Sequence, residues 1–191
     1  MPARGPFRIL VGAVLSTRTQ DPVTAAAAER LEGAAPDPSA LARLKPAAVE
    51  KLIYPVGFYH TKARALPELA RMLVERWQGR VPDTMEELLE LPGVGRKVAN
   101  IVLAGAFGRP AIAVDVHVQR ISNRLGIVRT TRPEQTEQAL ERILPRSVAG
   151  RWNVLLVALG QTICRPQRPR CGDCPVERWC RKVGVKRSAN S

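Results

Sequence analysis

The sequence is poor in aromatic side chains and contains no long apolar run. Phe, Trp and Tyr make up 4% of the 191 residues, too few for a platform on which the bases of a single strand would stack. No apolar run approaches the ~18 residues that a membrane span requires. The composition is nevertheless 45% hydrophobic, which is enough for a packed core and argues against disorder. We therefore expect a folded protein with no membrane association.

The N-terminal stretch MPARGPFRILVGAVLSTRTQD has only a superficial likeness to a secretory signal. Its apolar part is short, and no small-residue cleavage site follows before the polar STRTQD. An amphipathic helix entering a core is the preferred interpretation. The prediction is a cytoplasmic, nucleoid-associated protein without a signal peptide.

Cysteine is absent from residues 1–163. The segment CRPQRPRCGDCPVERWC holds all four, spaced C-x6-C-x2-C-x5-C: Cys164, Cys171, Cys174 and Cys180. Two disulfides, a zinc ion and an iron–sulfur cluster are the candidate roles. Disulfides are the least expected, because a cytosolic protein normally keeps its thiols reduced. Spacing alone does not separate zinc from iron, since four-cysteine sites serve both.

Acidic residues are outnumbered, 17 against 30 Lys plus Arg, giving a formal net charge of +13. Such a surplus indicates a polyanionic partner, although a basic protein without one is the alternative. The surplus is concentrated around the cysteines, where residues 161–191 contain eight basic and two acidic side chains. With so few aromatics, double-stranded DNA held through its phosphates is the partner that fits best.

Strand-like alternation is almost absent, and helical periodicity dominates. The sequence therefore predicts an all-α fold of about ten short helices, with a break near residues 108–110. The expected helices cover residues 8–17, 21–31, 37–44, 45–56, 62–77, 83–91, 96–107, 115–126, 132–144 and 151–164.

Two of these helices are joined by LPGVG, residues 91–95. Glycines allow a tight turn, and the backbone N–H groups that open the second helix form a phosphate site which does not read sequence. We predict that Gly93, Val94 and Gly95 contact DNA. An ordinary helix–helix turn is the alternative interpretation.

The segment LPGVGRKVANIVLAGAFGRPAIAVDVHVQRISNRLG resembles the helix-hairpin-helix core of the endonuclease III family of DNA repair glycosylases. The similarity also covers GFYHTKA upstream and the cysteine spacing downstream, from about Pro6 to Cys180. It implies a two-domain all-α fold that acts as a monomer and binds damaged or abasic duplex DNA in the cleft between its domains. Residues 6–110 would form the helical barrel domain, and residues 1–5 and 111–191 the cluster domain.

The same resemblance implies that the four cysteines hold a [4Fe-4S] cluster with a structural role. The family uses its cluster to fix the loop between the first two cysteines against DNA. Here that loop carries Arg165, Arg168 and Arg170 together with two prolines, and we predict that these arginines contact phosphates. Solvated charge that only maintains solubility is the alternative.

Lysine is scarce, with six Lys against 24 Arg, and Lys97 directly follows the hairpin. The positive end of a helix dipole disfavours a cation there, and a neutral amine is what a Schiff-base nucleophile requires. Taken alone, a lysine at this position is more often a phosphate-binding or solvated residue than a catalytic one. The family resemblance implies that Lys97 is catalytic, because members that only remove a base carry Ser, Tyr or another residue here.

Asp115 precedes an amphipathic helix, so it is expected to be an N-cap. The resemblance implies a catalytic role as well: a carboxylate near C1′ of the deoxyribose stabilises positive charge as the base leaves and assists proton transfer at Lys97. The implied reaction is base flipping, attack of Lys97 at C1′ and β-elimination of the 3′ phosphate. His117 is interpreted as structural.

The chain departs from the family pattern at three points. Arg18, in LSTRTQD, replaces a glutamine that fills the gap left by the flipped base, and Phe58 replaces a leucine that acts as a second wedge. A buried core position is the alternative for Phe58. The family usually has a further helix before the stretch matched by FRILVGAVLS; we expect either that the cluster domain lacks it or that it lies outside this sequence.

The sequence thus predicts a bifunctional DNA glycosylase and abasic-site lyase for oxidised pyrimidines. A mismatch-specific or monofunctional glycosylase is the enzymatic alternative, and Lys97 argues against it. A non-catalytic DNA-binding module is the alternative from another class.

Overall fold

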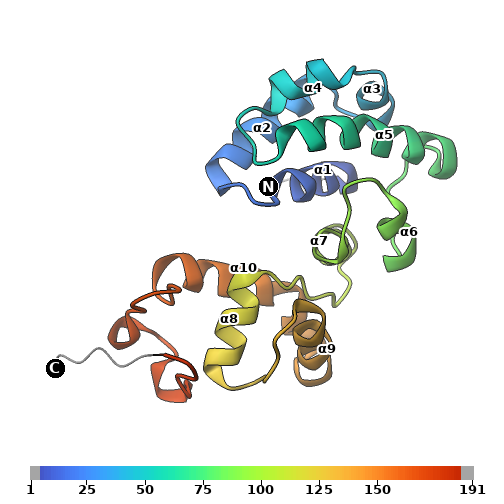
Figure 1. Ribbon diagram of the computed structural model, residues 1–191. Helices are drawn as coiled ribbons and strands as arrows, with labels where there is room; N and C mark the ends of the chain where they lie inside the picture. Colours follow the sequence, from blue (N-terminus) through green and yellow to red (C-terminus); the bar gives the residue numbers. More distant parts are fainter. Residues whose placement is uncertain (1–4, 186–191) are drawn as a thin grey trace. The chain divides into compact units, whose positions relative to one another are not determined.

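The computed structural model describes residues 5–185, and within that range every regular element is helical (Figure 1). The all-α prediction is confirmed, and the ten expected helices are present with shifted ends. They are α1 (Pro6–Ser16), α2 (Asp21–Ala34), α3 (Pro38–Ala42), α4 (Pro46–Ile53), α5 (Tyr59–Trp77), α6 (Met85–Glu90), α7 (Arg96–Phe107), α8 (Val116–Leu125), α9 (Pro133–Ile143) and α10 (Arg146–Thr162), followed by the short 3-10 turns η1 (Cys171–Asp173) and η2 (Glu177–Trp179).

Proline and short polar side chains mark the helix starts. Helices α1 to α4 and α9 have proline in their first two positions, where its fixed φ suits a helix and its missing N–H leaves nothing unpaired. Asp37, Thr84 and Asp115 are N-caps whose side chains accept backbone N–H groups. Helix α10 begins at Arg146, earlier than predicted. Gly150 disfavours a helix locally, but Ala149 is buried in a core, and this packing stabilises the first turn.

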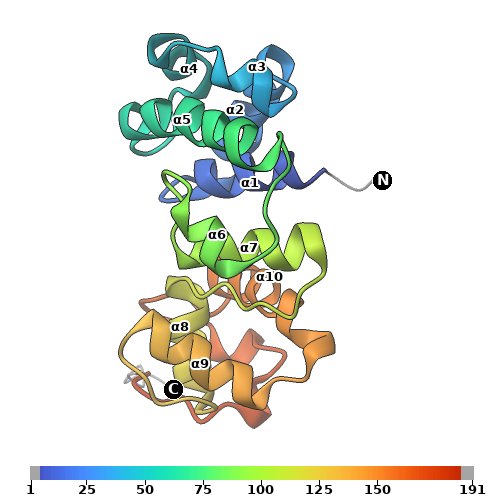
Figure 2. The same cartoon turned by 90° about the vertical axis from the view of Figure 1, so that its right-hand side faces the viewer.

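The structure divides into two compact units, of which the first extends to Arg109. In this unit α1 contacts α2 and α7, and α5 packs across α3 and α4 (Figure 2). Gly105 of α7 faces α1, where an added Cβ would lie in ordinary contact, 3.5 Å from Cγ2 of Ile9. The most deeply buried large side chains of this unit are Leu10, Leu15, Leu31, Leu41, Ile53, Leu66, Leu69, Leu73, Leu88 and Leu91.

The second unit begins at Pro110 and contains α8, α9, α10 and the two 3-10 turns. Helices α8 and α10 meet at Gly160, where an added Cβ would overlap the ring of His117. The close approach of the two helices therefore favours glycine at position 160. The core of the unit consists of Ile112, Val114, Val118, Ile121, Val128, Leu140, Ala149 and Leu156.

The assignment of residues 6–110 to a barrel domain and 111–191 to a cluster domain stays a prediction, and residues 1–4 of its N-terminal segment lie outside the described range. Among the described residues, no helix combines the length and the apolarity needed to cross a membrane.

Candidate active site and cysteine pocket

The hairpin between α6 and α7 has the tight turn that its glycines predict. Gly93 adopts a φ of +79°, and the N–H of Val94 donates to the carbonyl of Leu91 at 3.1 Å. Val94 is buried with 7% exposure, whereas Gly93 and Gly95 are exposed. Gly95 is the N-cap of α7, and a Cβ added to it would meet nothing within 4 Å. The space beside the N-cap of α7 is therefore free, as an anion site requires.

Lys97 is the second residue of α7 and is half-buried. Among the described residues, its Nζ has no hydrogen-bond or ion-pair partner. The amine thus lies next to the hairpin without an internal contact that a ligand would have to break. Lys97 belongs to the first unit and Asp115 to the second.

Asp115 is the N-cap of α8 and is half-buried. Its Oδ1 accepts hydrogen bonds from the backbone N–H groups of His117 and Val118, each at 2.9 Å. Both bonds use Oδ1, so the cap leaves the second carboxylate oxygen available. The expected structural role and the expected catalytic role are therefore compatible.

His117 contacts Arg120 on α8, with 3.2 Å between His117 Nδ1 and Arg120 Nη2, which agrees with its interpretation as structural. The same Nη2 donates to the carbonyl of Cys164 at 2.9 Å. Burial lowers the pKa of Arg120, and its buried Nε has no partner among the described residues. The sequence analysis does not identify Arg120, because nothing in its local pattern distinguishes it from a solvated arginine.

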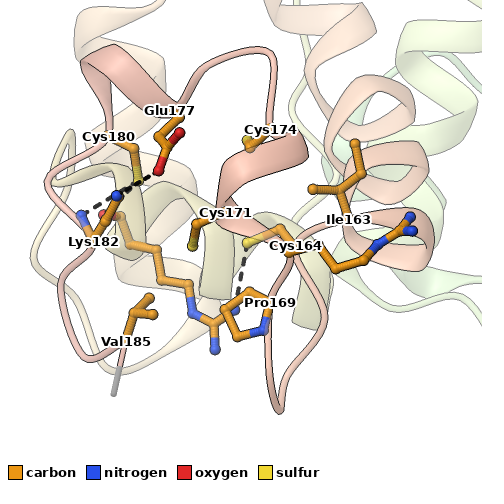
Figure 3. Close-up of a pocket in the computed structure, with 11 residues that line it drawn as sticks. Ile163, Cys164, Pro169, Cys171, Cys174, Glu177, Cys180, Lys182 and Val185 are labelled. Atoms are coloured by element: carbon orange, nitrogen blue, oxygen red, sulfur yellow. Dashed lines mark hydrogen bonds and ion pairs between the residues drawn. The ribbon is translucent and has the colours of Figure 1, made fainter. Parts of the chain in front are cut away.

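All four cysteines line one pocket of about 330 Å³, including its open mouth, in the second unit (Figure 3). None of them forms a disulfide. The groups that donate hydrogen bonds to the sulfurs come from α8 and from the segment that follows η2. Nη1 of Arg124 donates to Sγ of Cys164 at 3.4 Å, and the backbone N–H of Lys182 donates to Sγ of Cys180 at 3.4 Å.

The four thiols that line this pocket are a donor set that a [4Fe-4S] cluster or a zinc ion can use. Within residues 5–185, no three His, Cys, Asp or Glu side chains converge on a point where one metal ion would bind. A cubane binds each of four thiolates through a separate iron, so its ligands surround a volume. Burial raises the pKa of the Cys171 thiol, so an ionised sulfur there needs compensating positive charge, part of which the nearby Lys182 supplies.

The loop between Cys164 and Cys171 is held from α8. Arg124 donates from Nη1 to the carbonyl of Arg165 and from Nη2 to that of Pro166, both at 2.7 Å. The side chains of Arg165 and Arg168 are exposed and, among the described residues, unpaired. Arg170 is also exposed, but it donates to the carbonyl of Thr162 at 3.1 Å and pairs with Asp173 at 3.7 Å. Only the first two arginines are thus free to contact a phosphate without losing an internal bond.

Arg18 and Phe58 lie together in the first unit. The Cζ of Arg18 is 5.6 Å from the centroid of the Phe58 ring. Phe58 is 62% exposed at the start of α5, which excludes the buried-core alternative. The two side chains form an exposed cation–aromatic pair that the sequence does not predict, because 39 residues separate them.

The chain is similar to known DNA repair proteins over most of its length. The family described as HhH-GPD superfamily base excision DNA repair protein matches residues 11–146. Endonuclease III of Thermotoga maritima is 50% identical over 175 residues, which cover 92% of this chain and 82% of that protein. The chloroplastic endonuclease III homolog 2 of Arabidopsis thaliana is 43% identical over 91% of this chain, and the chain spans about half of its length, 47%.

A solved structure titled as a trapped endonuclease III–DNA covalent intermediate has the same fold. Its TM-score against this chain is 0.87, with 37% sequence identity. The superposition covers 94% of this chain and 84% of that one.

Proposed function

The chain belongs to the endonuclease III family of the HhH-GPD superfamily, and on this basis we propose which of its residues carry out the reaction. It is a bifunctional DNA glycosylase and abasic-site lyase of base excision repair. We propose oxidised pyrimidines in duplex DNA as its substrates and Lys97 as its nucleophile. The observation that carries the assignment is an amine in the first turn of α7, beside the hairpin, that has no partner among the described residues.

The chemistry follows from an amine at that position. The lone pair of Lys97 Nζ forms a bond to C1′ of the flipped nucleotide, and the bond from C1′ to the base breaks. The base leaves with that electron pair and takes up a proton. The sugar ring opens to an imine, loss of a C2′ proton then breaks the C3′–O bond, and the 3′ phosphate departs. Water finally hydrolyses the imine and releases Lys97.

Asp115 is proposed to act on the charge that develops at the sugar. A carboxylate stabilises the oxocarbenium-like state and accepts the proton that Lys97 loses as it attacks. The N-cap bonds use Oδ1 and hold the group in one orientation, so Oδ2 is available for this work.

The four cysteines are proposed to hold a [4Fe-4S] cluster. When bound, the cluster serves as a structural cross-link. Arg124 supports this arrangement, because it binds Cys164 and two loop carbonyls together. The chain's own contribution is a loop that presents Arg165 and Arg168 to solvent.

DNA is proposed to bind through two sets of contacts. The N–H groups at Gly93–Gly95 and α7 receive one phosphate, and the loop arginines receive others. Arg18 and Phe58 are proposed to enter the duplex where the base has left. Because each of these roles is assigned to residues of one chain, the enzyme is proposed to act as a monomer, and its mass in solution measured by light scattering tests this.

Borohydride trapping tests the assignment of Lys97. Wild-type protein on an abasic duplex should yield a covalent protein–DNA band, and Lys97→Ala should lose both the band and strand nicking while still binding DNA. Lys51→Ala, an exposed lysine of α4, is the matched control and should trap normally. Trapping by Lys97→Ala at the wild-type level would place the nucleophile elsewhere, and DNA binding by the wild type without any trapping or nicking would favour a non-catalytic module.

A further inference from the structure

Lys62 is a buried lysine to which the mechanism assigns no role. It lies on α5 with 7% exposure. Its Nζ donates to the carbonyls of Leu15 at 2.9 Å and Thr17 at 2.7 Å, and to Oγ1 of Thr19 at 3.4 Å. The three partners belong to the last residues of α1 and the turn that follows it. One amine therefore fixes the C-terminal end of α1 and this turn.

Burying the charged amine of Lys62 lowers the stability of the fold, because the ammonium group loses its hydration. Among the described residues, no carboxylate pairs with Lys62. Burial lowers its pKa to about 8, so the surroundings oppose the charged form even though carbonyls at the C-terminal end of a helix attract cations. Methionine or leucine would fill the same space without this desolvation cost.

The residues that Lys62 holds are those that shape the turn around Arg18. Arg18 lies between two of its partners and has a φ of +52°, a left-handed conformation unusual for a residue with a Cβ. Phe58 has a φ of +56° on the opposing segment. The Oγ1 of Thr19 connects the two segments, because it also accepts the backbone N–H of Gly57 at 3.1 Å. A Cβ at Gly57 would overlap the carbonyl oxygen of Arg18.

We propose that Lys62 is a positioning residue that assembles Arg18 and Phe58 into one wedge before DNA arrives. Its three hydrogen bonds hold the Thr17–Thr19 turn, and Thr19 transmits this constraint to the segment that carries Phe58. The wedge then needs little reorganisation when it replaces the extruded nucleotide. This inference rests on the proposed function, in which Arg18 and Phe58 enter the duplex.

Two other roles for Lys62 do not agree with the geometry. A second nucleophile would need an accessible nitrogen, whereas the Nζ is enclosed by its three acceptors. A plain core contact would not need hydrogen bonds to both sides of an exposed arginine.

The test compares lesion excision with abasic-site cleavage in full-length Lys62→Met. Base extrusion depends on the wedge, whereas an abasic site has no base to unstack and depends on it less. Single-turnover excision of thymine glycol should fall about 10-fold, and abasic-site cleavage should fall less than about 3-fold. The fluorescence rise of a 2-aminopurine placed next to the lesion should be lost, although the duplex still binds. Lys51→Met removes the same charge from an exposed position and should match the wild type.

Thr19→Val is the second variant, because it preserves shape and removes only the hydroxyl that connects the two segments. It should change both readouts in the same direction by a smaller factor, and it keeps the proposal testable if Lys62→Met does not fold. Equal losses of excision and abasic cleavage in both variants, or no loss in either, would overturn the inference.

A double-mutant cycle separates this inference from the function on which it rests. If Lys62 acts through the wedge, adding Lys62→Met to Arg18→Ala/Phe58→Ala should cause no further loss of lesion excision. A full additional loss would refute the positioning role and leave the wedge assignment standing. An unchanged 2-aminopurine signal in Arg18→Ala/Phe58→Ala would instead refute the wedge assignment itself.

Discussion

The Oδ1 atom of Asp115 accepts a 2.9 Å hydrogen bond from the backbone N–H of Val118, which fixes the carboxylate at the start of α8. Asparagine caps helices as well as aspartate and has nearly the same shape, but it carries no charge. Asp115→Asn should therefore unfold at the wild-type denaturant concentration and lose single-turnover excision by ~10²-fold or more, the scale expected when one positioned charged group is removed.

Asp37→Asn is the matched control for Asp115→Asn, because Asp37 is the N-cap of α3 and accepts the N–H of Ala40 at 2.8 Å. It should retain full activity. Full activity in Asp115→Asn as well would restrict Asp115 to its capping role.

The exposed arginines of the cysteine loop should determine part of the salt dependence of DNA binding. If the hairpin and the loop neutralise about four to six phosphates, log K should fall with log salt at a slope of roughly −4 to −5. Arg165→Glu/Arg168→Glu should make this slope shallower by about two. Arg43→Glu/Arg71→Glu changes the net charge equally at exposed positions of the first unit and controls for a general charge effect. A slope that the loop variant leaves unchanged would mean that these arginines are only solvated.

The cysteine pocket should contain iron and sulfide in the purified protein. Four iron and four sulfide per chain, with a yellow-brown colour, are expected because four thiolates bind one cubane. Cys171→Ser should lower the iron content and yield poorly soluble protein, since the loss of one ligand releases the basic loop. Colourless wild-type protein with one zinc per chain would exclude the cluster.

Lys62 should make stability depend on pH above neutrality. Its pKa is about 8 in the folded protein against 10.5 as the reference value, so between these limits the unfolded chain binds more protons. The free energy of unfolding must then rise with pH across this window, by at most roughly 3 kcal/mol for such a shift. Below pH 8 the penalty of burying the charge is fully present. From pH 8 to 10 the urea midpoint of the wild type should therefore rise relative to that of Lys62→Met. Parallel midpoints would show that the amine is not desolvated.

The sequence predicts the helices well because their signals are local. Prolines at helix starts and side chains such as Thr84 are visible within a few residues of the helix that they begin. The resemblance predicts that the four cysteines act together, and in the structure they line one pocket. Contacts between distant segments are not predictable in this way. Lys62 and Thr17 are 45 positions apart, and only the packing of α5 against the end of α1 reveals that they are bonded.

The start of α10 shows a second limit of local patterns. Gly150, the last residue of RSVAG, is typical of a break, so the sequence predicts that the helix begins after it, at Arg151. The burial of Ala149 overrides this preference, because tertiary packing stabilises a helical turn that the local residues alone would not form.

The burial of Lys62 also affects which adducts the protein can form with its own product. An opened abasic sugar is an aldehyde, and any accessible amine can condense with it, leaving the enzyme attached at an unproductive position. Guanidinium groups stay protonated and do not compete. With 24 Arg against six Lys, the chain binds an aldehyde-bearing polyanion mainly through groups that are inert towards it. Because the amine of Lys62 is enclosed by its three acceptors, it is not available to the product, which leaves Lys97, the proposed nucleophile, free of this competitor.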